Sequence, residues 1–278
     1  MRRKGFTLVE LLVVIAIIAL LMGILMPALS RVRQIAFRLV CGTNLSGIGK
    51  AMLIYANDYE DEFPKAGGPG TEWRGSGIAW NAADRKAAYG LSANGSGGKA
   101  TITSSLYLLV KYAEVTPKSF ICKGDPDVTE FNPGNNYDLI QLWDFGEKGT
   151  EHCSYSYHIP YSSFAMKTTS EPGMVIAADP NPWVDTTRSL DSFNPGGDKD
   201  AKRYANAATH QREGQNVLFL DSHVTFEDLS SCGIDDDNIY TQQVSGTDVR
   251  KGRIPSTRGY DPLTRTDSLV LDDRLGPQ

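Results

Sequence analysis

The sequence predicts an α+β protein in which one long N-terminal helix packs on an antiparallel β-sheet domain. Apolar residues run without interruption over 11–26 and then recur at mostly three- and four-residue steps as far as Tyr55, which indicates one continuous helix over about 7–59. Beyond it, short β-like runs alternate with Gly, Pro, Asn and Asp, which favours antiparallel strands. A chain of 278 residues is long enough for one large domain or two small ones.

The composition limits the classes of function. The net charge is −5 at pH 7, and 41% of the residues are hydrophobic. Mean hydropathy is −0.29, so most of the chain has the character of a soluble domain. Proteins that bind nucleic acid through phosphate contacts are usually basic. We therefore expect no nucleic-acid partner.

Residues 6–26 are long enough as a helix to cross the hydrocarbon core of a bilayer. A cleaved secretory signal peptide would have a shorter apolar run and a better small-residue cleavage site than the one near Pro27. A plain membrane anchor explains the length but not Glu10, because a carboxylate inside a membrane helix is costly unless it is paired or functional.

A third interpretation explains Glu10. The stretch KGFTLVE at residues 4–10 resembles the type IV prepilin cleavage and methylation signal of type IV pilins and type II secretion pseudopilins. The resemblance implies that residues 1–5 are a leader, which prepilin peptidase removes between Gly5 and Phe6. Phe6 then becomes the N-methylated terminus, and 6–26 is a transmembrane helix that later enters a filament core.

Glu10 matches the glutamate at the fifth mature position of that family. Cleavage leaves a positively charged amine on Phe6, and the Glu10 carboxylate of one subunit can pair with the amine of its neighbour. Opposite charges attract strongly where the dielectric constant is low, and each offsets the desolvation of the other. We therefore expect Glu10 to set the register between assembling subunits.

The resemblance also implies a location and partners. The expected topology is single-pass in the inner membrane, with the N-terminus cytoplasmic and the globular domain periplasmic or extracellular. Charge alone does not decide this orientation, because basic residues 2–4 precede the span and Arg31, Arg33 and Arg38 follow it. The expected partners are prepilin peptidase, other pilin or pseudopilin subunits, and the inner membrane.

The remaining chain divides into three parts. Residues 27–62 form the amphipathic half of the helix, although Gly42, Gly47 and Gly49 weaken the helical pattern. Residues 63–243 form the globular β domain, with a Gly-rich surface excursion over 66–99. Residues 244–278 are polar, and we expect an extended or partly disordered tail. Within the domain we expect a helix over 104–112 and strands over 119–122, 154–159, 174–178, 216–220 and 223–226.

The last two strands flank Asp221 and Ser222, which predicts a two-residue hairpin loop. This hairpin resembles the end of many large prepilin-type proteins, whose signature is His, nine residues, then Asp-Gly. Here His210 is followed by ten residues and then Asp221 and Ser222. Residues 41–45 (CGTNL) and 55–59 (YANDY) resemble helix-end motifs of that family, and 120–122 (FIC) resembles its central Cys-Pro motif with Lys123 in place of proline. The insertion and the substitutions indicate a divergent member.

Three groups of residues are candidates for chemistry. His210, Asp221 and His223, with Asp179, are candidates for a metal or catalytic site, but no His-Glu-x-x-His or Gly-x-Ser-x-Gly motif is present. We expect instead that Asp221 shapes the turn and that His210 bonds to nearby backbone.

The second group is acidic. Asp235, Asp236 and Asp237 suit calcium, but they lack the glycine and distal glutamate of an EF-hand loop. We expect a solvated turn there, with no metal and no cofactor.

The third group is the set of four cysteines. They contain no Cys-x-x-Cys motif, and export to an oxidising compartment would allow disulfides. Three pairings are possible, and we expect Cys122 with Cys153.

The sequence therefore favours a structural subunit of a pilus-like or pseudopilus-like filament and not an enzyme. The alternatives are a membrane-anchored periplasmic binding protein that uses the Gly-rich excursion, and a metal-dependent hydrolase centred on His210.

Overall fold

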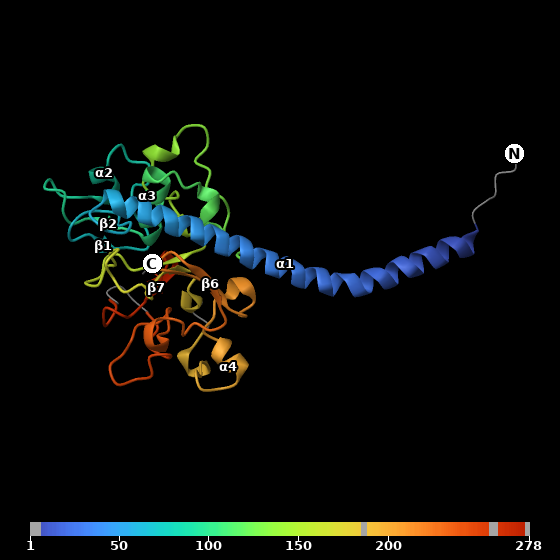
Figure 1. The fold of residues 1–278 in the computed structure, drawn as a ribbon. Coiled ribbons are helices and arrows are strands. Elements are labelled where there is room, and N and C mark those ends of the chain that lie inside the picture. The colour runs from blue at the N-terminus through green and yellow to red at the C-terminus, as the bar shows by residue number, and fades with distance from the viewer. Residues whose placement is uncertain (1–6, 185–187, 256–260, 276–278) are drawn as a thin grey trace.

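A long helix projects from a globular body in the computed structural model, which describes residues 7–184, 188–255 and 261–275 (Figure 1). Helix α1 spans Leu8–Asp58 and contains Pro27. A five-stranded antiparallel sheet lies in the body. The predicted α+β class is therefore confirmed, with the long helix packed on the sheet.

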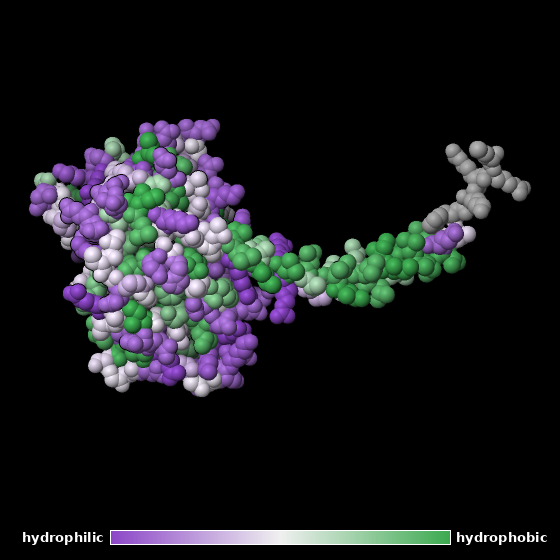
Figure 2. Space-filling model, viewed as in Figure 1, coloured by the Kyte–Doolittle hydropathy of each residue, from purple (hydrophilic) through white to green (hydrophobic). Residues whose placement is uncertain are grey.

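The two halves of α1 have different surroundings. Residues 7–33 are all exposed, whereas buried side chains begin at Cys41 and include Leu45, Ile48 and Met52. Pro27 lies in the exposed half, and the helix is visibly bent in Figure 1, as expected when a proline removes a backbone hydrogen bond inside a helix. The space-filling view shows the exposed half as an almost entirely apolar stem (Figure 2).

Two glycines of α1 lie where the helix meets the sheet. A Cβ atom on Gly49 would lie 2.6 Å from Leu218 Cδ1, and one on Gly42 would lie 3.0 Å from Asn216 Oδ1. Gly47 is exposed and has nothing within 4 Å of such a Cβ. Gly42 and Gly49 therefore lower the intrinsic helix propensity but allow close packing of the helix on the sheet.

The strand order of the sheet is β6-β5-β4-β3-β7. The strands are β3 (Ser156–His158), β4 (Val175–Ala178), β5 (Gln215–Phe219), β6 (Val224–Glu227) and β7 (Val270–Leu271). β5 is fully buried, and its residues alternate between two hydrophobic clusters. Leu218 lies in the cluster shared with α1, while Val217 and Phe219 lie in the other. The sheet is therefore covered on both faces.

The remaining elements are short. Helix α3 (Ile102–Tyr112) buries Leu106, Leu109 and Val110, as expected for 104–112. The predicted strand over 119–122 is wrong, because Pro117–Phe120 forms a 3-10 helix whose Pro117 lies in its first turn. Helix α4 (Lys199–Arg203) lies between β4 and β5 in the chain.

The Gly-rich segment 66–99 is more structured than expected. It contains β1 (Glu72–Trp73), α2 (Arg85–Tyr89) and the start of β2 (Lys99–Ala100), which pairs in parallel with β1. Trp73 and Tyr89 join the main hydrophobic cluster. Burial of these two aromatic side chains holds the segment against the domain.

The expectation of an extended tail over 244–278 is also wrong for the described residues. Val270 and Leu271 form β7, which pairs with β3 at the edge of the sheet. Asp273 follows it and accepts hydrogen bonds from the backbone N–H groups of Ile102 (2.9 Å) and Thr103 (2.7 Å) and from Trp73 Nε1 (2.8 Å). A carboxylate at the first turn of a helix satisfies its unpaired N–H groups, so the C-terminal segment fastens α3.

The glycines of α1 give a matched test of the helix–sheet contact. We expect Gly49→Ala to lower the free energy of unfolding by about 1–2 kcal/mol, because overpacking against Leu218 outweighs the gain in helix propensity. Gly47→Ala makes the same chemical change at an exposed site and should stabilise the chain by up to about 1 kcal/mol. Urea unfolding of the full chain in detergent, followed by tryptophan fluorescence, measures both. Equal effects of the two substitutions would contradict the close contact.

Candidate functional site

The N-terminus of α1 is closed by a reciprocal pair of hydrogen bonds between Thr7 and Glu10. The Glu10 carboxylate accepts from the Thr7 backbone N–H at 2.8 Å and from Thr7 Oγ1 at 2.7 Å. Thr7 Oγ1 accepts from the Glu10 N–H at 3.3 Å. This capping box satisfies N–H groups that have no partner within the helix. Gly5 and Phe6, the predicted processing residues, lie outside the described residues.

The stem that follows has the properties of a membrane span. Within the described part of the chain, α1 is the one helix long and apolar enough to cross a bilayer, with a mean hydropathy of 3.1 over its most apolar 18-residue window and none of that window buried. An exposed apolar surface of this kind requires lipid or another protein to cover it. The stem therefore indicates membrane anchoring.

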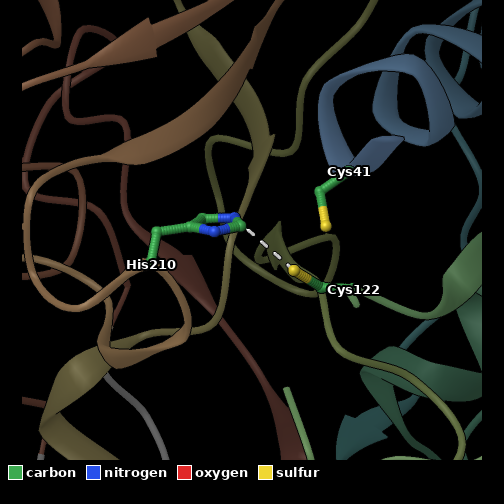
Figure 3. A group of neighbouring side chains, drawn as sticks. All are labelled: Cys41, Cys122 and His210. Carbon is green, nitrogen blue, oxygen red and sulfur yellow. Dashed lines mark hydrogen bonds between the residues drawn. The ribbon is translucent and has the colours of Figure 1, made fainter. Parts of the chain in front are cut away.

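A second group of reactive side chains lies inside the domain, next to the buried half of α1. Cys41 comes from α1, Cys122 from the segment after the 3-10 helix Pro117–Phe120, and His210 from the 3-10 helix Ala208–His210. Their sulfur and nitrogen atoms all lie within 4.8 Å of one another, and all three residues are buried. Figure 3 shows the His210 ring directed towards the two cysteines.

His210 also contacts two polar side chains of the sheet region. Its Nε2 atom lies 3.1 Å from Asp179 Oδ2, 3.2 Å from Asn216 Nδ2 and 3.5 Å from Cys122 Sγ. Asp179 Oδ2 accepts from the Asn216 backbone N–H at 2.6 Å and from Asn216 Nδ2 at 3.1 Å. Asp179 follows β4, and Asn216 lies in β5 beside it. The sheet therefore fixes the partners of His210.

These contacts shift the acidities of the group. A hydrogen bond with Cys122 lowers the pKa of the Cys41 thiol to about 6, against the opposing effect of burial. The same hydrogen bond, with burial, raises the pKa of Cys122. Burial acts to lower the pKa of His210, but hydrogen bonds with Asp179 and Cys41 outweigh it and raise this pKa to about 9. At Cys41 and at His210 the hydrogen bonds within the cluster therefore outweigh the opposing effect of burial.

Of the candidate group of His210, Asp221, His223 and Asp179, the structure brings together His210 with Asp179 and, separately, Asp221 with His223. Asp221 lies at the tip of the β5–β6 hairpin and bonds to the His223 ring, and its Oδ1 also accepts from the His223 backbone N–H at 3.1 Å. The predicted two-residue loop is one residue too short, because the Phe219 N–H still donates to the His223 carbonyl at 3.0 Å. Residues 220–222 form a three-residue loop, and Ser222, its last residue, has φ = 70°. Asp221 thus shapes the turn as expected, whereas His210 bonds to side chains and not to nearby backbone.

The expected disulfide and the expected solvated turn at Asp235, Asp236 and Asp237 also differ from the structure. Cys122 and Cys153 are not joined, and all four cysteines are free. Asp237 is buried and accepts from the Ser268 N–H at 2.9 Å, while Asp235 and Asp236 are exposed. Among the described residues, the only group of three or more close His, Cys, Asp or Glu ligand atoms is that of Cys41, Cys122 and His210.

Sequence reasoning missed this convergence, although its signal was present. Cys41 lies in the 41–45 motif, Cys122 ends the 120–122 motif, and His210 opens the hairpin signature. Three separate motifs of one resemblance each contribute one ligand-type side chain. Looking for a shared site among the motifs could have found the cluster.

Two Asp–His pairs allow a test of the buried interactions. We expect Asp179→Ala to lower the free energy of unfolding by about 3 kcal/mol or more, because it leaves His210 buried without its charged partner. Asp221→Ala removes an exposed pair with His223 and should cost about 1 kcal/mol or less. Urea unfolding of the full chain in detergent measures both. Comparable losses would show that burial does not distinguish the two pairs.

Comparison with known proteins bears on the N-terminal segment. Residues 1–26 match the family model described as the prokaryotic N-terminal methylation motif. No curated protein and no solved structure matches the chain. The motif points to a structural, pilin-type substrate of prepilin peptidase and not to an enzyme. With the long apolar helix that follows it, the motif fits a type IV pilin-like protein.

Proposed function

We propose that this protein is a structural subunit of a type IV pilus-like or type II secretion pseudopilus-like filament. Prepilin peptidase processes it, and the inner membrane holds it before assembly. The observation that carries this proposal is a methylation motif at residues 1–26 continuous with a stem whose residues 7–33 are all exposed. The folded domain is attached to the other half of the same helix.

The exposed stem gives the proposal its physical basis. Apolar side chains that the described part of the chain leaves exposed, such as Leu8, Leu20 and Met26, need an apolar environment. Lipid supplies it before assembly, and the stems of other subunits supply it afterwards. In this arrangement the N-terminus is cytoplasmic, and the globular domain is periplasmic or extracellular.

Glu10 has a role in both states of the proposed subunit. In the single chain its carboxylate caps α1 through Thr7, which lessens the cost of a charge near the start of an apolar helix. After cleavage, Phe6 carries a charged amine directly before Thr7 in the sequence. We infer that in the filament the carboxylate pairs with the amine of a neighbouring subunit.

Processing is tested by mass spectrometry of the N-terminal peptide of the chain purified from membranes. We expect the mature chain to begin at an N-methylated Phe6, and Gly5→Val to leave Met1 in place by blocking the cut. Gly23→Val is the matched control, since it alters a glycine of the same segment with nothing within 4 Å of its Cβ position. An unprocessed Met1 in the unaltered chain, or a cut after Met26, would contradict the proposal.

The charge of Glu10 is tested apart from its capping role. Gln at the third helical position also completes a capping box, so Glu10→Gln preserves the helix start but removes the charge. We expect Glu10→Gln and Glu10→Ala both to reduce the amount of subunit in sheared filaments by at least about tenfold, because the buried amine loses its partner. Membrane levels should be unchanged for Glu10→Gln. Normal incorporation of Glu10→Gln would show that capping, and not charge pairing, is what assembly requires.

A further inference from the structure

We propose that Cys41, Cys122 and His210 bind a zinc ion, with the carboxylate of Asp179 as the fourth ligand. None of these residues belongs to the N-terminal segment on which the filament proposal depends. The two proposals therefore stand independently.

The donor set and its spacing suit zinc. Zn²⁺ is bound by thiolate sulfur, imidazole nitrogen and carboxylate oxygen in tetrahedral sites, with bonds of about 2.0–2.3 Å. Neighbouring donor atoms of such a site lie roughly 3.3–3.8 Å apart. Here Cys122 Sγ lies 3.5 Å from His210 Nε2, and the three donors lie within 4.8 Å of one another. Small side-chain movements bring them to bonding distance.

Asp179 completes the site after a movement of its carboxylate, because it lies beside His210 but outside the group of ligand atoms that are all within 4.8 Å of one another. Its Oδ2 atom lies 3.1 Å from the same His210 Nε2 that faces Cys122. An ion bonded to that nitrogen has this carboxylate beside it. Asp179 is fully buried, and its Oδ1 atom has no hydrogen-bond partner among the described residues. A buried carboxylate is stabilised by a paired charge or by a metal, and a divalent cation bound to His210 would replace the charged imidazole in this role.

The groups around the ligands hold them in place. Asn216 donates to Asp179 through its backbone N–H and its side chain. The Tyr240 hydroxyl donates to the Asp179 carbonyl at 2.9 Å, and the Tyr155 hydroxyl donates to the Cys41 carbonyl at 3.3 Å. Outer partners of this kind orient ligands and raise metal affinity.

A surface cleft reaches one of the proposed ligands, His210. The cleft lies between the exposed part of α1 and the domain, and its lining includes His210, Lys123 and Gly124. Gly124 packs so closely that a Cβ there would lie 2.2 Å from the Thr209 carbonyl oxygen. The absence of a side chain at 124 therefore lets the Cys122 segment approach the His210 segment.

Zinc at this position would join four parts of the chain that are separate in sequence. One ligand comes from α1, one from the segment after Pro117–Phe120, one from the residue after β4 and one from the 3-10 helix before β5. Because metal binding adds to folding free energy, the ion would fasten the buried half of the helix to the sheet.

Metal content of the full chain tests the proposal. The chain is purified in detergent without chelators, and zinc is measured by inductively coupled plasma mass spectrometry. We expect about one zinc per chain, and at least a fivefold loss in Cys41→Ser, Cys122→Ser and His210→Ala. Cys153→Ser and Cys232→Ser remove cysteines outside the cluster and should keep the zinc. Loss in all five variants, or retention in all five, would overturn the assignment.

Cobalt binding by the unaltered chain gives a measurement that does not depend on how the variants fold. Co²⁺ added to the chelator-treated protein should give sulfur-to-metal charge-transfer absorption and the intense visible bands of a four-coordinate ion. Thiol titration in denaturant distinguishes the alternatives. Absence of metal with four free thiols overturns the proposal. So does absence of metal with two thiols that appear only after reduction, which would indicate a Cys41–Cys122 disulfide.

Discussion

The structure depends on the contact between the second half of α1 and strand β5. Gly49 of the helix lies against Leu218 of the strand so closely that a methyl group would not fit. This contact fixes the helix on one face of the sheet, while Val217 and Phe219 bury the opposite face. A fully buried central strand specifies its register strongly, because a shift by one residue would turn its side chains to the wrong face. The stem and the domain are thereby joined in one orientation.

The buried polar cluster lies along this same contact. On α1, Cys41 precedes the buried Leu45 by four residues, which is about one helical turn. On β5, Asn216 precedes Leu218 by two residues, so both lie on the same face of the strand. Apolar packing excludes water from the space between them, and this raises the cost of any unpaired polar group. The Asp179 carboxylate offsets that cost by accepting hydrogen bonds from Asn216 and by pairing with His210. The contact between α1 and β5 therefore both buries apolar side chains and brings the polar cluster together.

The sequence predicted what depends on local periodicity. Helix α1, helix α3 and four of the strands follow from the spacing of apolar residues, whereas the hairpin loop is one residue longer than its turn residues indicate. The edge strand β7 could not be predicted, since two residues, Val270 and Leu271, become a strand only because β3 offers a free edge. The cluster was also beyond local patterns, because Cys122 and His210 stand 88 residues apart. Gly42 and Gly49 weaken the helical pattern, and the structure shows why: both lie where a side chain would press against residues of β5.

The unbroken course of α1 sets a distance between membrane and domain. At 1.5 Å per residue, the helix from Leu8 to Cys41, where burial begins, is about 50 Å long. With its first 30 Å or so within the hydrocarbon core, about 20 Å of helix remains, on which Arg31 and Arg33 are exposed and Arg38 pairs with Glu213 of the domain. This basic stretch of helix separates the domain from the hydrocarbon core, so the stem can leave the bilayer while the domain stays outside it.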